Sequence, residues 1–113
     1  MISKELVGAS ARPLLLTILD RQDSYGYEII RKIERLSGGQ LEWKEGMLYP
    51  VLHRLEDEML VSSYWSEGEA GRRRKYYRLT AAGRESLETE KSHWRLIDSM
   101  LSDMWSSEPG LAT

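Results

Sequence analysis

The segment Gly71–Thr80, with the sequence GRRRKYYRLT, constrains the fold of this chain more than any other part of it. Four consecutive cations lead directly into a strand-like run, Tyr76–Leu79. A second strand-like run, Leu60–Trp65, precedes it, and the connector between the two runs contains Gly68 and Gly71. A glycine-bearing connector between two such runs favours a β-hairpin. We therefore predict a hairpin with cations at its tip, which can reach phosphates or a minor groove.

The composition is typical of a globular chain without a membrane segment. Of the 113 residues, 41% are hydrophobic and 30% are charged, which suits one modest core. No apolar run approaches the ~20 residues of a membrane span, and the N-terminus lacks the layout of a signal peptide. The absence of cysteine excludes disulfides and thiolate metal sites and fits a reducing compartment. We therefore expect a cytoplasmic protein with neither a metal nor another cofactor.

The charge of the chain is unevenly distributed along the sequence. The formal net charge is −2, but residues 72–78 carry five cations and no anion. Residues 81–113 carry three cations and six anions, a net charge of −3. Binding to nucleic acid depends on the local patch rather than on the charge of the whole chain. The acidic C-terminal part therefore argues only weakly against a basic DNA-binding surface near residues 72–78.

The apolar residues before position 60 recur at helical spacing and predict three helices. The first extends to about residue 20 and is kinked or restarted near Pro13. Ser24 is the candidate N-cap of the second helix, which ends at the pair Gly38 and Gly39. The third begins between Lys44 and Met47 and ends near residue 58.

The third helix has a buried and an exposed side. Leu48, Leu52 and Leu55 lie within ~40° of one another at about 100° per residue, so they should face the core. Proline lacks an N–H, which only the first turns of a helix tolerate. The helix should therefore begin late enough to place its proline there. The residues predicted to face solvent are Tyr49, Pro50 and His53.

Three helices followed by two strands form the order of a winged helix-turn-helix, a mainly α (α+β) fold. We assign residues 1–80 to this DNA-binding domain, with the third helix in a major groove and the hairpin beside it. Thr80 should cap a final helix over residues 81–105, and residues 106–113 should form a flexible tail. That helix carries a heptad-like apolar seam, which predicts dimerisation because it is too apolar to stay exposed. The seam residues are Leu87, Trp94, Ile97, Leu101 and Met104.

Candidate DNA contacts lie on the exposed side of the third helix, at the hairpin tip and at the start of the second helix. They are Tyr25, Lys44, Gly46, Tyr49, Pro50, His53, Arg54, Arg72, Arg73, Arg74 and Lys75. Lys44 and Arg54 are expected to bind phosphates and so to position the protein. Plainer roles remain open, because a charge run is usually a solvated loop and Tyr25 is equally a core residue. Tyr76 and Tyr77 point to opposite faces of a strand, so at least one should pack.

Three motifs in order resemble those of the PadR family of bacterial transcriptional regulators. The chain reads YGYEI at Tyr25–Ile29, GMLYPVLHRLE at Gly46–Glu56 and RRKYYRLT at Arg73–Thr80. The resemblance covers roughly residues 5–105 and indicates the branch with a single C-terminal helix. One departure is Met59, where the family usually has the glycine that closes the recognition helix. A residue that is less suited to a left-handed backbone lowers the stability by about 1 kcal/mol there, or it moves the end of the helix.

The resemblance implies a homodimeric DNA-binding repressor that a small aromatic effector releases from its operator. In drug-binding members of the family, paired tryptophans from two subunits sandwich flat aromatic compounds. Trp94 lies at the corresponding place on the final helix, although plain dimer packing is the alternative. Asp98, one turn later, is a candidate partner for a cationic effector or simply an exposed carboxylate. Trp43, Trp65 and Trp105 are expected to pack in the core or an interface.

Two other functions compete with that of a DNA-binding regulator. An enzyme is disfavoured because the chain has no cysteine nucleophile, no Gly-x-Ser-x-Gly elbow, no phosphate-binding loop and no His-Glu-x-x-His motif. The two histidines, His53 and His93, fall on different predicted elements, which argues against a shared metal site. A winged helix that binds protein instead of DNA is the alternative to a regulator, and the five hairpin cations argue against it.

Overall fold

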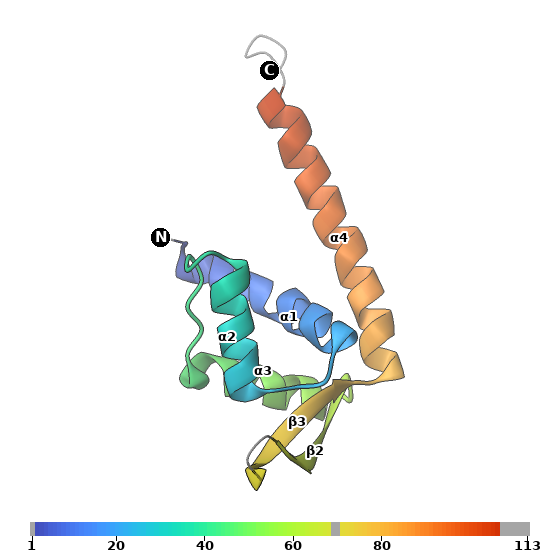
Figure 1. Cartoon of the computed structure of the whole chain (residues 1–113). Coiled ribbons are helices and arrows are strands. Elements are labelled where there is room, and N and C mark those ends of the chain that lie inside the picture. Colours follow the sequence, from blue (N-terminus) through green and yellow to red (C-terminus); the bar gives the residue numbers. More distant parts are fainter. Residues whose placement is uncertain (1, 69–70, 107–113) are drawn as a thin grey trace.

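The computed structural model of the chain describes residues 2–68 and 71–106. Its elements are α1 (Lys4–Arg21), β1 (Ser24–Tyr25), α2 (Gly26–Leu36), α3 (Glu45–Asp57), β2 (Val61–Glu67), β3 (Arg73–Leu79) and α4 (Ala81–Ser106). The first three helices pack together, the β2–β3 hairpin projects from one side of them, and α4 extends away from the opposite side (Figure 1). The predicted order of three helices, a hairpin and a final helix is therefore present. Of the predicted tail, residues 107–113 lie outside the described residues.

The hairpin belongs to a three-stranded antiparallel sheet with the order β1-β3-β2. In β1, Ser24 pairs with Tyr77 and Tyr25 pairs with Tyr76. The prediction that Ser24 caps α2 is wrong, because Tyr25 occupies the cap position and makes no side-chain cap bond. Ser24 is wholly buried; its hydroxyl donates to the Gln22 carbonyl at 3.0 Å and accepts from Lys32 Nζ at 3.1 Å.

Both helical prolines lie inside their helices rather than at their starts. The structure has one helix from Lys4 to Arg21, so α1 is not restarted at Pro13. Ser3 caps it by accepting a 3.2 Å bond from the Leu6 N–H. The expectation that α3 begins late enough to place Pro50 in its first turn is also wrong. That helix begins at Glu45, so Pro50 falls in the second turn and leaves the carbonyl four residues earlier without its usual partner.

The core lies between α1, α2, α3 and the inner face of the sheet. Leu48, Leu52 and Leu55 are all wholly or almost wholly buried, as the helical spacing predicted. Trp43 and Tyr77 are also buried. This confirms the prediction that Trp43 packs, and the prediction that at least one of the adjacent Tyr76 and Tyr77 does so. Each such side chain contributes about 1.5–3 kcal/mol through removal of apolar surface from water. The core therefore fixes which side of α3 faces outward.

The start of α4 is tied to the rest of the domain. Thr80 caps it as predicted, because its hydroxyl accepts the Gly83 N–H at 3.0 Å. Arg84 pairs with Asp20 of α1 at 3.6 Å, and Leu87 is buried against the core. The later turns of α4 leave the domain and expose most of their side chains (Figure 1). Within the described residues, no helix combines the length and apolarity needed to cross a membrane.

Candidate nucleic-acid interface

The outward side of α3 carries a small exposed surface next to the wing, the name used here for the β2–β3 hairpin. Because the leucines of α3 face the core, Gly46, Pro50, His53 and Arg54 are exposed. Lys44, the N-cap residue, is exposed as well. Gly46 adds no side chain and lies on the N-terminal turn, where helix N–H groups favour an anion. This side of α3 is thus open to a large partner along its first three turns.

Tyr49 is the exception to this pattern. It was predicted to face solvent, but it is only partly exposed and packs against the hydrophobic core. Its hydroxyl lies against the position where a Cβ at residue 26 would be, so glycine there makes room for it. The His53 ring lies 6.2 Å from the Tyr49 ring, centroid to centroid. Tyr49 therefore joins α3 to the start of α2, and the sequence motifs that contain both residues meet in space.

The wing has two faces with different roles, because side chains alternate along a strand. Val61, Ser63 and Tyr77 lie on the inner face, toward α3, where the Ser63 hydroxyl donates to Glu56 Oε2 at 2.5 Å. Tyr64 and Tyr76 lie on the outer face, with their rings stacked at 5.7 Å. The sheet register thus assigns every wing residue to the α3 side or to the opposite side.

The five wing cations are divided between these faces. Arg72 and Arg73, nearest the tip, are exposed. Arg74 lies on the outer face with its guanidinium 4.2 Å from the centre of the Tyr25 ring. Lys75 lies on the inner face near the Tyr77 ring, at 5.6 Å. Because neighbouring strand residues point to opposite faces, only some of these cations can face DNA, and the register favours Arg73 and Lys75 on the side of α3.

Arg78 is largely occupied by contacts within the chain. Its Nε pairs with Asp23 at 3.2 Å and its guanidinium lies 4.9 Å from the Tyr64 ring centre. The Tyr64 hydroxyl also donates to Asp23, at 2.6 Å, and this hydrogen bond is the main cause that raises the pKa of Tyr64. Asp23 and Tyr64 were not singled out in the sequence. They are separated by 41 positions, and no local spacing signals such a pair.

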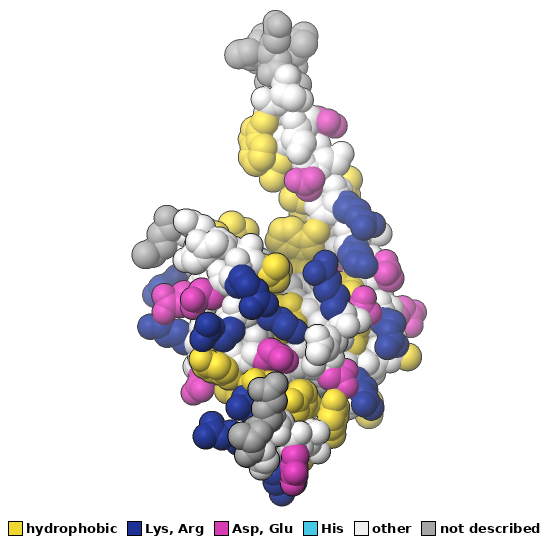
Figure 2. Space-filling model, in the orientation of Figure 1, with side chains coloured by type: hydrophobic (Ala, Val, Ile, Leu, Met, Phe, Trp, Pro, Cys, Tyr) yellow, Lys and Arg dark blue, Asp and Glu magenta, His cyan; other side chains and the backbone are white. Residues whose placement is uncertain are grey.

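Tyr25 lies where the sheet and α2 meet. It is partly exposed, its ring is covered by Arg74, and it meets Tyr76 edge-on at 5.4 Å. Tyr25 thus packs within the chain and also lies near the surface, and its contact with a phosphate stays a prediction. In Figure 2, dark blue Lys and Arg side chains lie over the domain body and the wing. The projecting end of α4 shows hydrophobic and acidic side chains instead.

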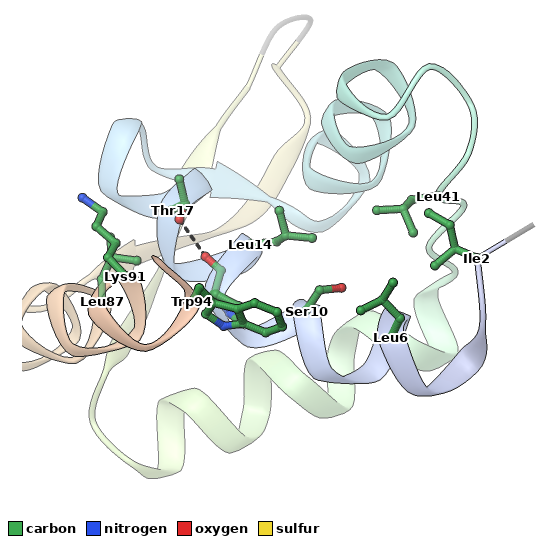
Figure 3. Close-up of a pocket in the computed structure, with 10 residues that line it drawn as sticks. Ile2, Leu6, Ser10, Leu14, Thr17, Leu41, Leu87, Lys91 and Trp94 are labelled. Carbon is green, nitrogen blue, oxygen red and sulfur yellow. Dashed lines mark hydrogen bonds between the residues drawn. The ribbon is translucent and has the colours of Figure 1, made fainter. Parts of the chain in front are cut away.

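Trp94 is placed between α4 and α1, away from the wing. It is partly exposed and lines a cavity of about 430 Å³ whose wall is almost entirely apolar. Leu6, Leu14 and Leu87 contribute to that wall, and the indole extends along α1 (Figure 3). The charged residue that lines the cavity is Lys91, whereas Asp98 does not line it within one chain. Leu87 is buried in the domain core, so it is separate from the exposed part of the seam.

The remaining seam residues are exposed on the projecting half of α4. Ile97, Leu101 and Met104 are 47%, 39% and 63% exposed, and Trp105 is 76% exposed. Counted at about 100° per residue, Trp105 falls beside Trp94 and Leu101 and extends the seam by one position. Trp105 follows Trp94 by about three helical turns, and this spacing could have been used to predict it as a seam residue from the sequence.

Helices α2 and α3 with the β2–β3 hairpin form a winged helix-turn-helix, the predicted fold class and that of a DNA-binding domain. The chain belongs to the PadR-like family of transcriptional regulators, whose family model matches residues 15–89. Membership makes the chain a transcriptional regulator rather than an enzyme, as predicted, and implies that it binds DNA.

Relatives of known structure share nearly the whole fold. A PadR-like transcriptional regulator from Bacillus cereus is 27% identical, with a TM-score of 0.83 over 93% of this chain and 100% of its own. A transcriptional regulator from Clostridium thermocellum is 30% identical, with a TM-score of 0.81 over 91% of this chain and 97% of its own.

A further relative is similar in sequence. The transcriptional regulator YqjI of Escherichia coli is 34% identical over 87 residues, which are 77% of this chain but 40% of YqjI.

Proposed function

We propose that the chain acts in the cytoplasm as a homodimeric repressor. It binds operator DNA through α3 and the wing and is released when a small aromatic molecule binds beside Trp94. The observation that carries the proposal is the arrangement of α3 and the wing. The exposed side of α3 lies beside a hairpin whose Arg73 and Lys75 share the sheet face that packs on α3. A helix in the major groove and cations over the adjacent backbone then supply sequence reading and affinity respectively.

Dimerisation is supported by the exposed seam of α4. Ile97, Leu101 and Met104 leave a row of apolar side chains on a helix that extends beyond the domain. Monomeric soluble proteins rarely expose such a row, and a second copy of the same helix provides a matching one. In this arrangement, α4 sets the distance between the two recognition helices, which must suit the spacing of the two half-sites.

An effector at Trp94 is supported by the apolar cavity between α1 and α4. A flat aromatic molecule fits its leucine-lined wall, and the indole offers a face for stacking. A molecule bound there displaces α4 relative to α1 and so changes the spacing of the two wings. Asp98 meets a cationic effector only where a second copy brings it to the site, because it does not line this cavity within one chain.

The DNA part of the proposal is tested by mobility shift on the DNA upstream of the chain's own gene. Binding should weaken steeply as salt rises, since phosphate contacts release counterions. Changing both Arg72 and Arg73 to alanine should reduce the affinity and lower the slope of log affinity against log salt by about two per protomer, or about four for the dimer. Arg35→Ala, an exposed cation at the far end of α2, is the matched control and should bind normally. Salt-insensitive binding, or a wing variant that binds like the control, contradicts the proposal.

The repressor and effector parts need separate measurements. Deleting the gene should raise transcription from its own upstream region, whereas a fall indicates an activator. Flat aromatic dyes should quench the tryptophan fluorescence and release the DNA, and both effects should disappear in Trp94→Ala. Trp105→Phe is the control for quenching, because it also removes a tryptophan of α4, but one that lies outside the cavity. Quenching that persists in Trp94→Ala rules out Trp94 as the platform.

A further inference from the structure

Trp65 is a large aromatic side chain on the wing that the core does not cover. It was expected to pack, yet 59% of it is exposed, in the middle of a paired strand. It lies two and four positions after Ser63 and Val61, so it shares their face of the sheet. That face packs on α3 through the Ser63–Glu56 hydrogen bond. The indole therefore continues the α3 side of the sheet beyond the edge of the core.

Arg73 stacks on this indole. Its guanidinium carbon lies 5.3 Å from the ring centre, and the register places both residues on the same face across the β2–β3 ladder. A guanidinium that stacks on an aromatic face keeps its N–H edges free to bind phosphate oxygens. Arg78 has an ion pair with Asp23, whereas Arg73 has none within residues 2–68 and 71–106. Glu67 is the direct cross-strand partner of Arg73 but makes no ion pair with it, so Arg73 is held by the indole and not by a salt bridge.

We propose that Trp65 is a positioning residue of the DNA interface. Its indole holds the Arg73 guanidinium toward the duplex and lies itself against the sugar-phosphate backbone. The inference rests on the proposed function, because it needs a duplex seated on α3 and the wing. A second copy of the chain is a poorer occupant of this surface. A two-fold contact centred on this surface would bring Arg73 and Lys75 close to the same cations of the second copy, because the residues nearest the axis meet their own copies.

The test compares full-length variants in the same mobility-shift assay. Trp65→Ala should weaken DNA binding roughly three- to tenfold, and Trp65→Phe should retain most of the affinity because a benzene ring still stacks. The salt dependence should stay nearly that of the unaltered protein, since no charge is removed. Arg73→Ala should lower the slope of log affinity against log salt by about one per protomer, or about two for the dimer. Leu36→Ala, which shortens an exposed apolar side chain at the end of α2, is the control and should bind normally.

A double variant shows whether Trp65 acts through Arg73. If it does, Trp65→Ala should reduce the DNA affinity less when Arg73 is already alanine than it does in the unaltered protein. Fluorescence provides a second readout: DNA should change the tryptophan emission of the unaltered protein, and most of that change should be lost in Trp65→Phe, which still binds. Retained folding should be visible as an unchanged urea midpoint, because the side chain is exposed.

Several outcomes overturn the inference. The positioning role is excluded if the losses of DNA affinity in Trp65→Ala and Arg73→Ala add up in the double variant. It is also excluded if Trp65→Phe loses as much affinity as Trp65→Ala, or if the emission does not change on DNA binding. A change in oligomeric state in place of DNA affinity assigns the indole to an interface between copies. If the unaltered protein and the Arg72 and Arg73 variants behave as proposed while Trp65→Ala binds normally, only this inference fails. If the unaltered protein binds no DNA at low salt, the proposed function fails with it.

Discussion

The hydroxyl of Tyr49 lies against the backbone of Gly26, at the point where α3 meets the first residue of α2. A Cβ at position 26 would overlap the hydroxyl and the ring carbon that carries it. Glycine is therefore required there for space and not for a special backbone angle, since position 26 is an ordinary helical residue. The contact sets how α3 lies against α2, and so it orients the recognition helix.

Gly26→Ala should destabilise the fold by about 1–3 kcal/mol, because overpacking forces the tyrosine or the helix to shift. Urea unfolding measures this directly. Gly8→Ala is the matched control, since nothing lies within 4 Å of its would-be Cβ and it sits inside α1. That change should stabilise the helix by roughly 0.5–1 kcal/mol. Truncating Tyr49 to alanine should abolish most of the Gly26→Ala penalty, and an undiminished penalty would exclude the overlap as its cause.

A second prediction concerns the turn that closes α3. Met59 has a φ of 63°, in the left-handed region that glycine occupies freely, so the helix end has kept its geometry without a glycine. Its side chain is 76% exposed and contributes little packing. Met59→Gly should therefore raise the free energy of unfolding by up to about 1 kcal/mol, net of the extra freedom of the unfolded chain. Met59→Ala keeps the Cβ strain, so a gain of equal size in that variant would contradict the explanation.

The helical and hairpin parts of the fold were predictable because their signals are local. Leu48, Leu52 and Leu55 recur at the spacing of one helix face, and Thr80 stands directly before the helix it caps. β1 was not predictable in this way. It consists of two residues whose strand character exists only because Tyr76 and Tyr77 lie beside them in the folded chain.

The same distinction applies to the candidate site. The exposure of His53 and Arg54 follows from helix geometry. The prediction of four cations at the tip is only partly right, because β3 begins at Arg73, earlier than the run predicted from Tyr76, and leaves Arg72 alone between the strands. The position of Tyr49 does not follow, because a space left by a glycine on another helix admits its ring. Asp23 likewise finds Tyr64 and Arg78 only after the sheet has formed. Non-local contacts of this kind decide which side chains remain free to meet DNA.

Arg78 should matter little for DNA binding although it belongs to the basic segment. Its charge is matched by Asp23 and its guanidinium lies on Tyr64, on the outer face of the sheet. Arg78→Ala should leave the DNA affinity within about twofold and the salt dependence unchanged, unlike Arg73→Ala. Asp23→Asn should instead strengthen binding at low salt, because it leaves the cation unmatched. A large loss of affinity in Arg78→Ala would show that the ion pair opens on DNA.

Stability should fall at alkaline pH because two tyrosines hold their protons more firmly in the folded chain. Burial raises the pKa of Tyr77, and the hydrogen bond to Asp23 raises that of Tyr64. Below about pH 10 both groups are protonated in either state and the stability is complete. As the pH rises further, the unfolded chain ionises first, so the free energy of unfolding decreases. Urea unfolding from about pH 8 to about pH 11 measures the decrease. Tyr64→Phe should make this decrease smaller. A free energy of unfolding that stays constant over this pH range would contradict the raised pKa values.

The exposed seam of α4 provides the sharpest test of the proposed dimer. Leu101→Glu places a charge on the seam, and it should convert the dimer to a monomer, because a charge buried between two helices must be desolvated without a partner. Ser99→Glu makes a charge at an exposed position on nearly the opposite side of the same helix and should leave the dimer intact. Light scattering during size exclusion distinguishes the two. The winged domain does not depend on Leu101 for its core, so the variant should still fold, with unchanged helical circular dichroism.

The DNA affinity of Leu101→Glu should drop steeply, because one wing and one recognition helix must then bind alone. A Leu101→Glu protein that remains dimeric would assign the interface to another surface.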